Sequence, residues 1–225
     1  MTEGILLVDK KKGITSYDVI RGLKRELPKG IKIGHAGTLD PFATGLLIVM
    51  IGRGATKLMN NFHKLQKEYE VEAKFGFATD TQDITGKIIK RSEKEEVSLE
   101  IIREILDKEF RGVIEQTPPI YSAKKIAGKK AYELAREGKD VKLSPKKVNI
   151  YEIDILKYSY PTLKLRVVCS TGTYIRTIVN DLGEKFGLYA TATELRRTKI
   201  GPFSLKDCSD SIIPLDKVLE KLSYE

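Results

Sequence analysis

The sequence contains little cysteine. Its 225 residues include only Cys169 and Cys208, which lie far apart and form neither a CxxC pair nor a cluster with histidine. Disulfide-stabilised domains and structural zinc sites both need more ligating side chains at close spacing. The sequence therefore excludes a disulfide framework, predicts no metal site and favours buried thiols in a reducing compartment.

Long apolar segments are absent as well. The N-terminal stretch MTEGILLVDKKKG holds only a short apolar run between charged residues, too short for a signal peptide or a membrane span. There is no Pro-, Gln- or Ser-rich tract, and hydrophobic residues make up 41% and charged residues 32% of the chain, as in folded domains. We expect a cytoplasmic protein without a membrane partner, and a monomer by default.

Acidic residues are outnumbered. Lys and Arg total 40 against 31 Asp and Glu, which gives a net charge of +9 and a pI near 9.3. Such an excess favours a polyanionic partner such as nucleic acid. Charge alone does not separate RNA from DNA or membrane, or from an evenly charged surface. A DNA-binding module is the weaker reading, since no helix-turn-helix or zinc-finger spacing is present.

Strands and helices are expected in an irregular order. Apolar runs and alternating apolar and polar residues predict strands at 5–8, 46–51, 68–77, 148–158 and 163–169. Capping residues and helical spacing predict helices from Thr15 or Ser16 to Pro28, at 99–110, at 174–186 and after Pro214. Because strands and helices do not alternate regularly, the pattern favours an α+β fold with a mixed sheet over a doubly wound one.

Residues 116–147 differ from the rest of the chain. Thr117-Pro118-Pro119 disrupts regular structure, and many lysines follow, including Lys124, Lys125, Lys129 and Lys130. We interpret this stretch as a basic insertion that contacts nucleic acid, with a solvated charged face as the alternative.

The densest functional signal is the loop GHAGTLDPFATGLL around Asp40. Glycines allow close backbone approaches, and Pro41 restricts Asp40 to an extended conformation, so the carboxylate is held in place. A simple turn acid before proline is an equally weighted alternative. A phosphate-binding loop is discounted, because no GxxxxGK[ST] or GxGxxG is present and an acid would repel phosphate.

A second segment, STGTYIRT at 170–177, places Tyr174 and Arg176 at a strand-to-helix junction. An arginine beside a carboxylate keeps the carboxylate ionised, so Arg176 is a candidate partner of Asp40. An ordinary surface arginine is the alternative.

Several motifs together resemble one family. GHAGTLDPFATGLL resembles the signature of the TruB family of tRNA pseudouridine synthases, and the same order of motifs continues in GILLVDKKKGITSYDVI, KEY with GFATDTQD, QTPPIYSAKK, and CSTGTYIRTI with ELRRT. The resemblance covers nearly the whole chain. It implies the pseudouridine synthase fold, an α+β mixed and mainly antiparallel sheet flanked by helices, in one catalytic domain at 1–225 whose insertion at 116–147 clasps RNA.

The resemblance also implies the reaction and its residues. It implies isomerisation of the T-loop uridine of tRNA, by base flipping and without a cofactor or metal. The implied catalytic residues are Asp40, Tyr69 and Arg176; the implied substrate contacts are His35, Asp83, Tyr174 and Leu195; and the implied RNA contacts are Lys67, Lys124, Lys125, Lys129, Lys130, Arg196 and Arg197.

Two points qualify this assignment. Bacterial members commonly continue into an RNA-binding PUA domain, and we expect none here because the sequence ends soon after Pro214. The second hypothesis is a non-catalytic basic RNA-binding protein or tRNA chaperone of the same fold, for which Asp40 would have no chemical role.

Overall fold

The computed structural model describes residues 3–94, 96–122, 124–126, 129–130 and 143–223. The chain divides into two compact units, Met1–Glu70 with Leu195–Glu225, and Val71–Glu194. Both boundaries fall inside strands, β4 (Lys67–Phe75) and β12 (Ala190–Ile200), so each unit takes part of both strands.

The sheet of the first unit is built around β3 (Thr44–Ile51). β1 (Gly4–Lys10) pairs antiparallel with β3, and β2 (Ile33–Ala36) does so as well. β12 instead runs parallel to β3, with Arg197 opposite Gly45. At its margins, β14 (Ile213–Pro214) pairs with β1 and β13 (Phe203–Ser204) with β12. The predicted strand at 46–51 is confirmed at the centre.

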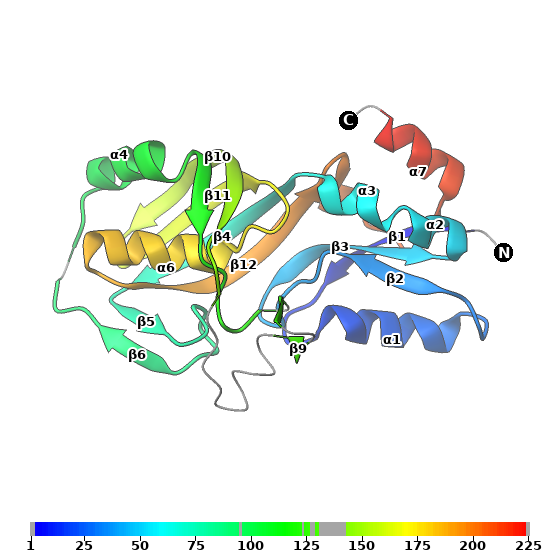
Figure 1. Ribbon diagram of the computed structural model, residues 1–225, viewed down its shortest axis with the longest axis horizontal. Helices are drawn as coiled ribbons and strands as arrows, with labels where there is room; N and C mark the ends of the chain where they lie inside the picture. Colours follow the sequence, from blue (N-terminus) through cyan, green and yellow to red (C-terminus); the bar gives the residue numbers. More distant parts are fainter. Residues whose placement is uncertain (1–2, 95, 123, 127–128, 131–142, 224–225) are drawn as a thin grey trace. The chain divides into compact units, whose positions relative to one another are not determined.

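Helices cover both faces of β3, which explains its continuous apolar sequence. Leu46, Ile48 and Met50 pack in one cluster with Phe62 and Val218, whereas the alternate residues pack with side chains of α1. α1 (Ser16–Glu26) is capped by Thr15 in a capping box with Asp18, as the sequence predicts. The other face carries α2 (Arg53–Lys57), α3 (Met59–Lys64) and α7 (Leu215–Leu222) (Figure 1).

The second unit has an antiparallel sheet. β10 (Lys146–Ser159) pairs with β11 (Thr162–Cys169) and with β7 (Gly112–Gln116), and β4 lies beside β11. α4 (Leu99–Glu109) is capped by Ser98, and α6 (Ile175–Phe186) ends at Gly187 in the left-handed conformation. A hairpin of β5 (Phe77–Thr79) and β6 (Ile88–Arg91) follows β4, separated from it by Gly76 at φ 106°.

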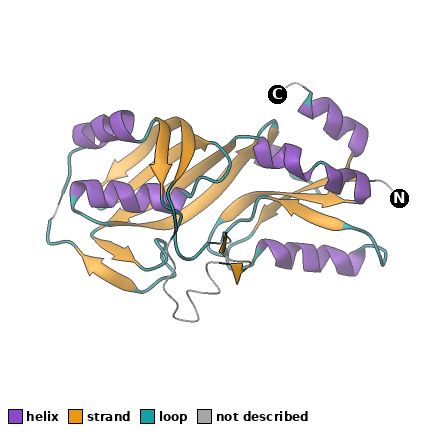
Figure 2. Ribbon diagram, viewed as in Figure 1, coloured by secondary structure: helices purple, strands orange, loops and turns teal. Residues whose placement is uncertain are grey.

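The α+β fold with a mixed, mainly antiparallel sheet is confirmed (Figure 2). Strands β2, β6, β7 and β12 and helices α2 and α3 are not among the predicted elements. Of the insertion at 116–147, the structure describes a short antiparallel pair, β8 (Lys125–Ile126) with β9 (Lys129–Lys130); residues 123, 127–128 and 131–142 lie outside the described part. Within the described residues, every helix is too short or too polar to cross a membrane. Cys169 is buried and Cys208 half-buried.

Candidate functional site

Asp40 lies in a loop that is held by backbone hydrogen bonds. The Asp40 loop, residues 37–43, connects β2 to β3. The Ala43 N–H donates to the Asp40 carbonyl at 3.1 Å, which closes a tight turn with Pro41 in its second position. The Gly13 N–H donates to the Pro41 carbonyl at 2.7 Å. The loop is therefore tied both to itself and to the segment after β1.

A buried serine holds the residue before Asp40. Ser16, the first residue of α1, is 1% exposed, and its Oγ accepts from the Leu39 N–H at 2.9 Å and donates to the Leu39 carbonyl at 3.3 Å. Since both polar groups of Leu39 are bound, the backbone that presents Asp40 has little freedom.

Lys10 brings a buried positive charge close to Asp40. Its side chain is fully buried, and Nζ donates to the carbonyls of Ile14 at 2.8 Å and Lys11 at 3.0 Å. Burial lowers the pKa of Lys10, the Asp40 carboxylate opposes this by raising it, and Arg197 lowers it further. A nearby cation favours an ionised carboxylate, the form that a nucleophile or base requires.

His35 precedes the Asp40 loop, on β2. Burial lowers the pKa of this half-buried imidazole, and the charges of Arg197 and His63 lower it further. Its Nδ1 is buried and has no hydrogen-bond partner among the described residues. At neutral pH the side chain is therefore an uncharged aromatic surface; its contact with RNA stays a prediction.

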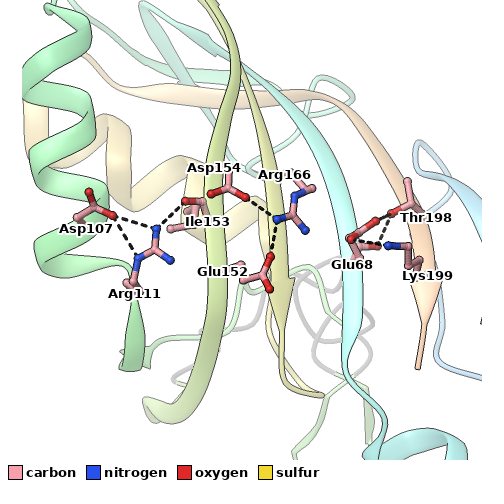
Figure 3. A network of polar contacts seen from close by, with 9 residues as sticks. All are labelled: Glu68, Asp107, Arg111, Glu152, Ile153, Asp154, Arg166, Thr198 and Lys199. Carbon is pink, nitrogen blue, oxygen red and sulfur yellow. Dashed lines mark hydrogen bonds and ion pairs between the residues drawn. The ribbon is translucent and has the colours of Figure 1, made fainter. Parts of the chain in front are cut away.

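Tyr69 and Leu195 lie on neighbouring strands of the first unit, β4 and β12. Leu195 is 7% exposed and Tyr69 is half-buried. Next to Tyr69, the Glu68 carboxylate accepts from Thr198 Oγ1 at 2.7 Å and pairs with Lys199 Nζ at 3.1 Å (Figure 3). These contacts hold β4 against β12 at the position of Tyr69.

In the second unit, Arg176 is buried and pairs with Asp83. Its Nη1 lies 3.4 Å from Asp83 Oδ2, and its guanidinium donates to the carbonyls of Thr81 and Tyr121. The other Asp83 oxygen accepts from the Thr85 N–H at 2.9 Å and from its hydroxyl. Sequence reasoning brought Arg176 and Asp83 into one site but did not predict that they pair.

The amide of Gln116 fixes Tyr174. Gln116 is 2% exposed; its Oε1 accepts from the Tyr174 N–H at 2.7 Å and its Nε2 donates to the Tyr174 carbonyl at 3.0 Å. Tyr174 is the N-cap of α6. The first residue of the predicted insertion thus positions the strand-to-helix junction, a role that sequence reasoning missed.

The predicted RNA-binding cations fall into two groups. Lys67 is 6% and Arg197 1% exposed, and their charged ends donate to backbone carbonyls. The Arg196 side chain is 41% exposed and forms an ion pair with Asp9 at 2.9 Å. Lys124 is half-buried, and Lys125, Lys129 and Lys130 lie on β8 and β9. RNA contact by each of them stays a prediction.

The predicted site residues are divided between the units. His35, Asp40, Tyr69 and Leu195 belong to the first unit, whereas Asp83, Tyr174 and Arg176 belong to the second. The pairing of Arg176 with Asp40 stays a prediction.

Comparison with models of protein families identifies the family of the chain. The model of the TruB family pseudouridylate synthase N-terminal domain matches residues 24–175, and that of the tRNA pseudouridylate synthase B C-terminal domain matches residues 176–224. The chain belongs to the TruB family. Asp40 and its loop lie within the first match, and Leu195 to Arg197 within the second.

Curated relatives agree along most of the chain. tRNA pseudouridine synthase B of Protochlamydia amoebophila is 48% identical over 92% of this chain and 77% of its own length. That of Caldicellulosiruptor saccharolyticus is 44% identical over 96% of this chain and 76% of its own length. This TruB-family protein is accordingly an isomerase that forms pseudouridine in tRNA.

Solved structures give the same fold. A chain in the crystal structure of a Cbf5-Nop10-Gar1 complex superimposes with a TM-score of 0.68 at 28% identity, covering 96% of this chain. A chain of an H/ACA RNP bound to a substrate RNA containing 2'-deoxyuridine gives 0.65 at 26% identity. This chain spans about half the length of both, 54% and 52%.

Proposed function

We propose that this protein isomerises the uridine of the T loop, in the T arm of tRNA, and that the Asp40 carboxylate is the reacting group. The anchoring of the Asp40 loop carries the proposal. The residues on both sides of Asp40 are bound through their backbone, to Ser16 and to Gly13, so the carboxylate is presented on a fixed frame. Such preorganisation is what a reaction at a bound sugar requires.

The chemistry demands a carboxylate of this kind. Isomerisation breaks the bond between N1 of uracil and C1′ of ribose, forms a bond between C5 and C1′, and transfers the C5 proton away while N1 gains one. Asp40 can attack C1′, add to the pyrimidine ring, or remove the 2′ proton; each route starts from an ionised acid held beside the nucleoside. The buried ammonium of Lys10, near Asp40, favours that ionised form.

Tyr69 is proposed to stack on the flipped uracil. A T-loop uridine leaves its stack only at a cost of roughly a few kcal/mol, and an aromatic face offsets part of that cost. The hydroxyl of Tyr69 is also a candidate to relay the C5 proton. If the hydroxyl relays the proton, Tyr69→Phe slows turnover by at least about 100-fold and leaves the affinity for tRNA unchanged. Tyr69→Leu, which also removes the aromatic face, slows turnover and lowers the affinity.

Release of tritium tests the role of Asp40. Unmodified tRNA carrying tritium at uridine C5 is incubated with the wild type and with Asp40→Asn, and label in water is followed. We expect release by the wild type and none by the variant, with equal melting temperatures and tRNA affinities. Release by Asp40→Asn at the wild-type rate would remove Asp40 from the mechanism, and would favour another group as the reacting one.

A second substrate tests the choice of uridine. In a transcript whose T-loop uridine is replaced by cytidine, we expect no label to be released, although the RNA still binds. A full equivalent of label from this transcript would place the target at another uridine. We further propose that the enzyme acts as a monomer in the cytoplasm, which sedimentation of the tRNA complex and cell fractionation test.

A further inference from the structure

Arg197 is one of the largest fully buried side chains in the described part of the chain. Its Nε donates to the Leu46 carbonyl at 2.7 Å and its Nη2 to the Gly37 carbonyl at 3.0 Å. Gly37 is the first residue of the Asp40 loop, and Leu46 lies in β3 just after the loop's other end. One guanidinium therefore joins the end of the loop near β2 to the start of β3.

From these contacts we propose that Arg197 is a positioning residue for catalysis, which clamps the two ends of the Asp40 loop and so fixes the carboxylate. The guanidinium is suited to this task because its donors are arranged in a rigid planar fork. A lysine ammonium at the same place has no such fork and would hold the two carbonyls less firmly. This assignment replaces a phosphate contact, which a side chain 1% exposed in the structure is poorly placed to make.

The neighbouring arginine supports the distinction. Successive side chains of a strand point to opposite faces, and Arg196 and Arg197 follow this rule on β12. The Arg196 side chain is 41% exposed and lies against Asp9, whereas Arg197 points into the interior. Of the two adjacent arginines of β12, Arg196 therefore faces solvent and Arg197 is buried in the interior.

Glycines leave room for the clamp. A Cβ built at Gly37 would lie 3.3 Å from Arg197 Nη1, so the guanidinium packs directly on the Gly37 peptide. On the other end, a Cβ at Gly45 would lie 2.2 Å from the Arg197 carbonyl, because β3 and β12 approach closely there. Arg197 is also near enough to lower the pKa of both Lys10 and His35, which places its charge beside the loop.

The inference rests on the proposed function only in taking Asp40 as the reacting group. Arg197→Lys keeps the charge and removes the fork. We expect kcat to fall about 10- to 100-fold, since misplacement by about 1 Å can have that effect, while the dissociation constant of the tRNA complex stays within about twofold. Arg111→Lys is the matched control, because Arg111 also donates to a backbone carbonyl, that of Ile153 (Figure 3), outside the Asp40 loop.

Hydrogen exchange measures the clamp without catalysis. We expect the amides of Leu39 and Ala43, bound to Ser16 Oγ and the Asp40 carbonyl, to exchange faster in Arg197→Lys than in the wild type, and to be unchanged in Arg111→Lys. If the loop amides exchange faster in Arg197→Lys but Asp40→Asn is fully active, the clamp by Arg197 is supported and the catalytic role of Asp40 is refuted.

Three results decide against the clamp. Wild-type kcat in Arg197→Lys is one, and loop amides that exchange as in the wild type are another. The third is a loss of tRNA affinity with kcat unchanged at saturating tRNA, which would support a contact between Arg197 and an RNA phosphate. If Arg197→Lys does not fold, Gly37→Ala takes its place; this variant crowds Nη1 and also strains a φ of 83°. It must speed exchange of the Leu39 and Ala43 amides and lower kcat without weakening tRNA binding; otherwise the proposal fails.

Discussion

Arg176 and Asp83 form an ion pair at 3.4 Å in which the side chains are 3% and 7% exposed. Removing one partner of a buried pair leaves the other charge uncompensated, which costs about 3–5 kcal/mol. We therefore expect Asp83→Ala to lower the free energy of unfolding by that amount in urea titrations followed by circular dichroism. Asp107→Asn is the control: its side chain is 66% exposed and pairs with Arg111, so the loss should stay below about 1 kcal/mol. Equal losses in the two variants would show that burial does not set the energy of the Asp83 pair.

Lys67 is expected to stabilise the fold rather than to bind RNA. Its ammonium donates to the carbonyls of His63 and Leu65, at the end of α3. Lys67→Met leaves these groups unsatisfied, and we expect a loss of about 1–3 kcal/mol in the free energy of unfolding. The salt dependence of tRNA binding distinguishes the roles, because removing a phosphate contact reduces the logarithmic slope by about one. We expect the slope of Lys67→Met to equal that of the wild type. A reduced slope together with wild-type stability would support a contact between Lys67 and RNA.

Much of the fold could be predicted from local patterns. The caps Thr15 and Ser98, the apolar run at 46–51 and Gly187 give the bounds of α1, α4, β3 and α6 to within about two residues, because capping and periodicity are local. β12 was missed because its sequence, ATATELRRTKI, carries charges that do not read as a buried strand. The reason is tertiary: Arg197 finds carbonyl partners on β3 and its flanking loop.

The site was predictable to a different degree. Motifs identified Asp40 and its loop, because glycines and a proline around one acid are visible in sequence. Contacts over long separations were not visible: Ser16 binds Leu39 across 23 residues, and Gln116 binds Tyr174 across 58. The same limit applies to the burial of Lys67 and Arg197, since charge in sequence does not tell an interior cation from an exposed one.

The two histidines should make stability depend on pH. Burial is the main cause that lowers the pKa of both His35 and His63; Arg197 acts further on His35, and Lys67 on His63. The unfolded chain then binds more protons below the ordinary histidine pKa, about 6.5, so stability is full above that pH and falls as the pH drops below it. We expect His35→Gln to flatten this slope in melts at several pH values, with His63→Gln contributing separately. A slope unchanged in the double variant would assign it to carboxylates.

Gly45 should tolerate no side chain. Its φ is 104°, and a Cβ would lie 2.2 Å from the Arg197 carbonyl and 2.7 Å from the Arg197 nitrogen, both backbone atoms. Because backbone cannot turn aside as a side chain can, Gly45→Ala must separate β3 from β12 where the two strands pair. We expect a loss of at least about 3 kcal/mol in the free energy of unfolding, as for other substitutions that overpack a core or strain a special φ, measured in urea.

Gly13→Ala separates strain from crowding. Gly13 has a φ of 88°, yet nothing lies within 4 Å of a Cβ built there, so this variant carries the backbone strain alone, about 1–2 kcal/mol. If Gly45→Ala and Gly13→Ala lose the same free energy of unfolding, the close approach of β12 adds no cost at Gly45. The parallel pairing of Gly45 with Arg197 is then looser than its geometry implies. A larger loss in Gly45→Ala, together with faster exchange of the Ala43 amide, would show that the pairing of β12 with the start of β3 also supports the Asp40 loop, because Ala43 is only two residues before Gly45.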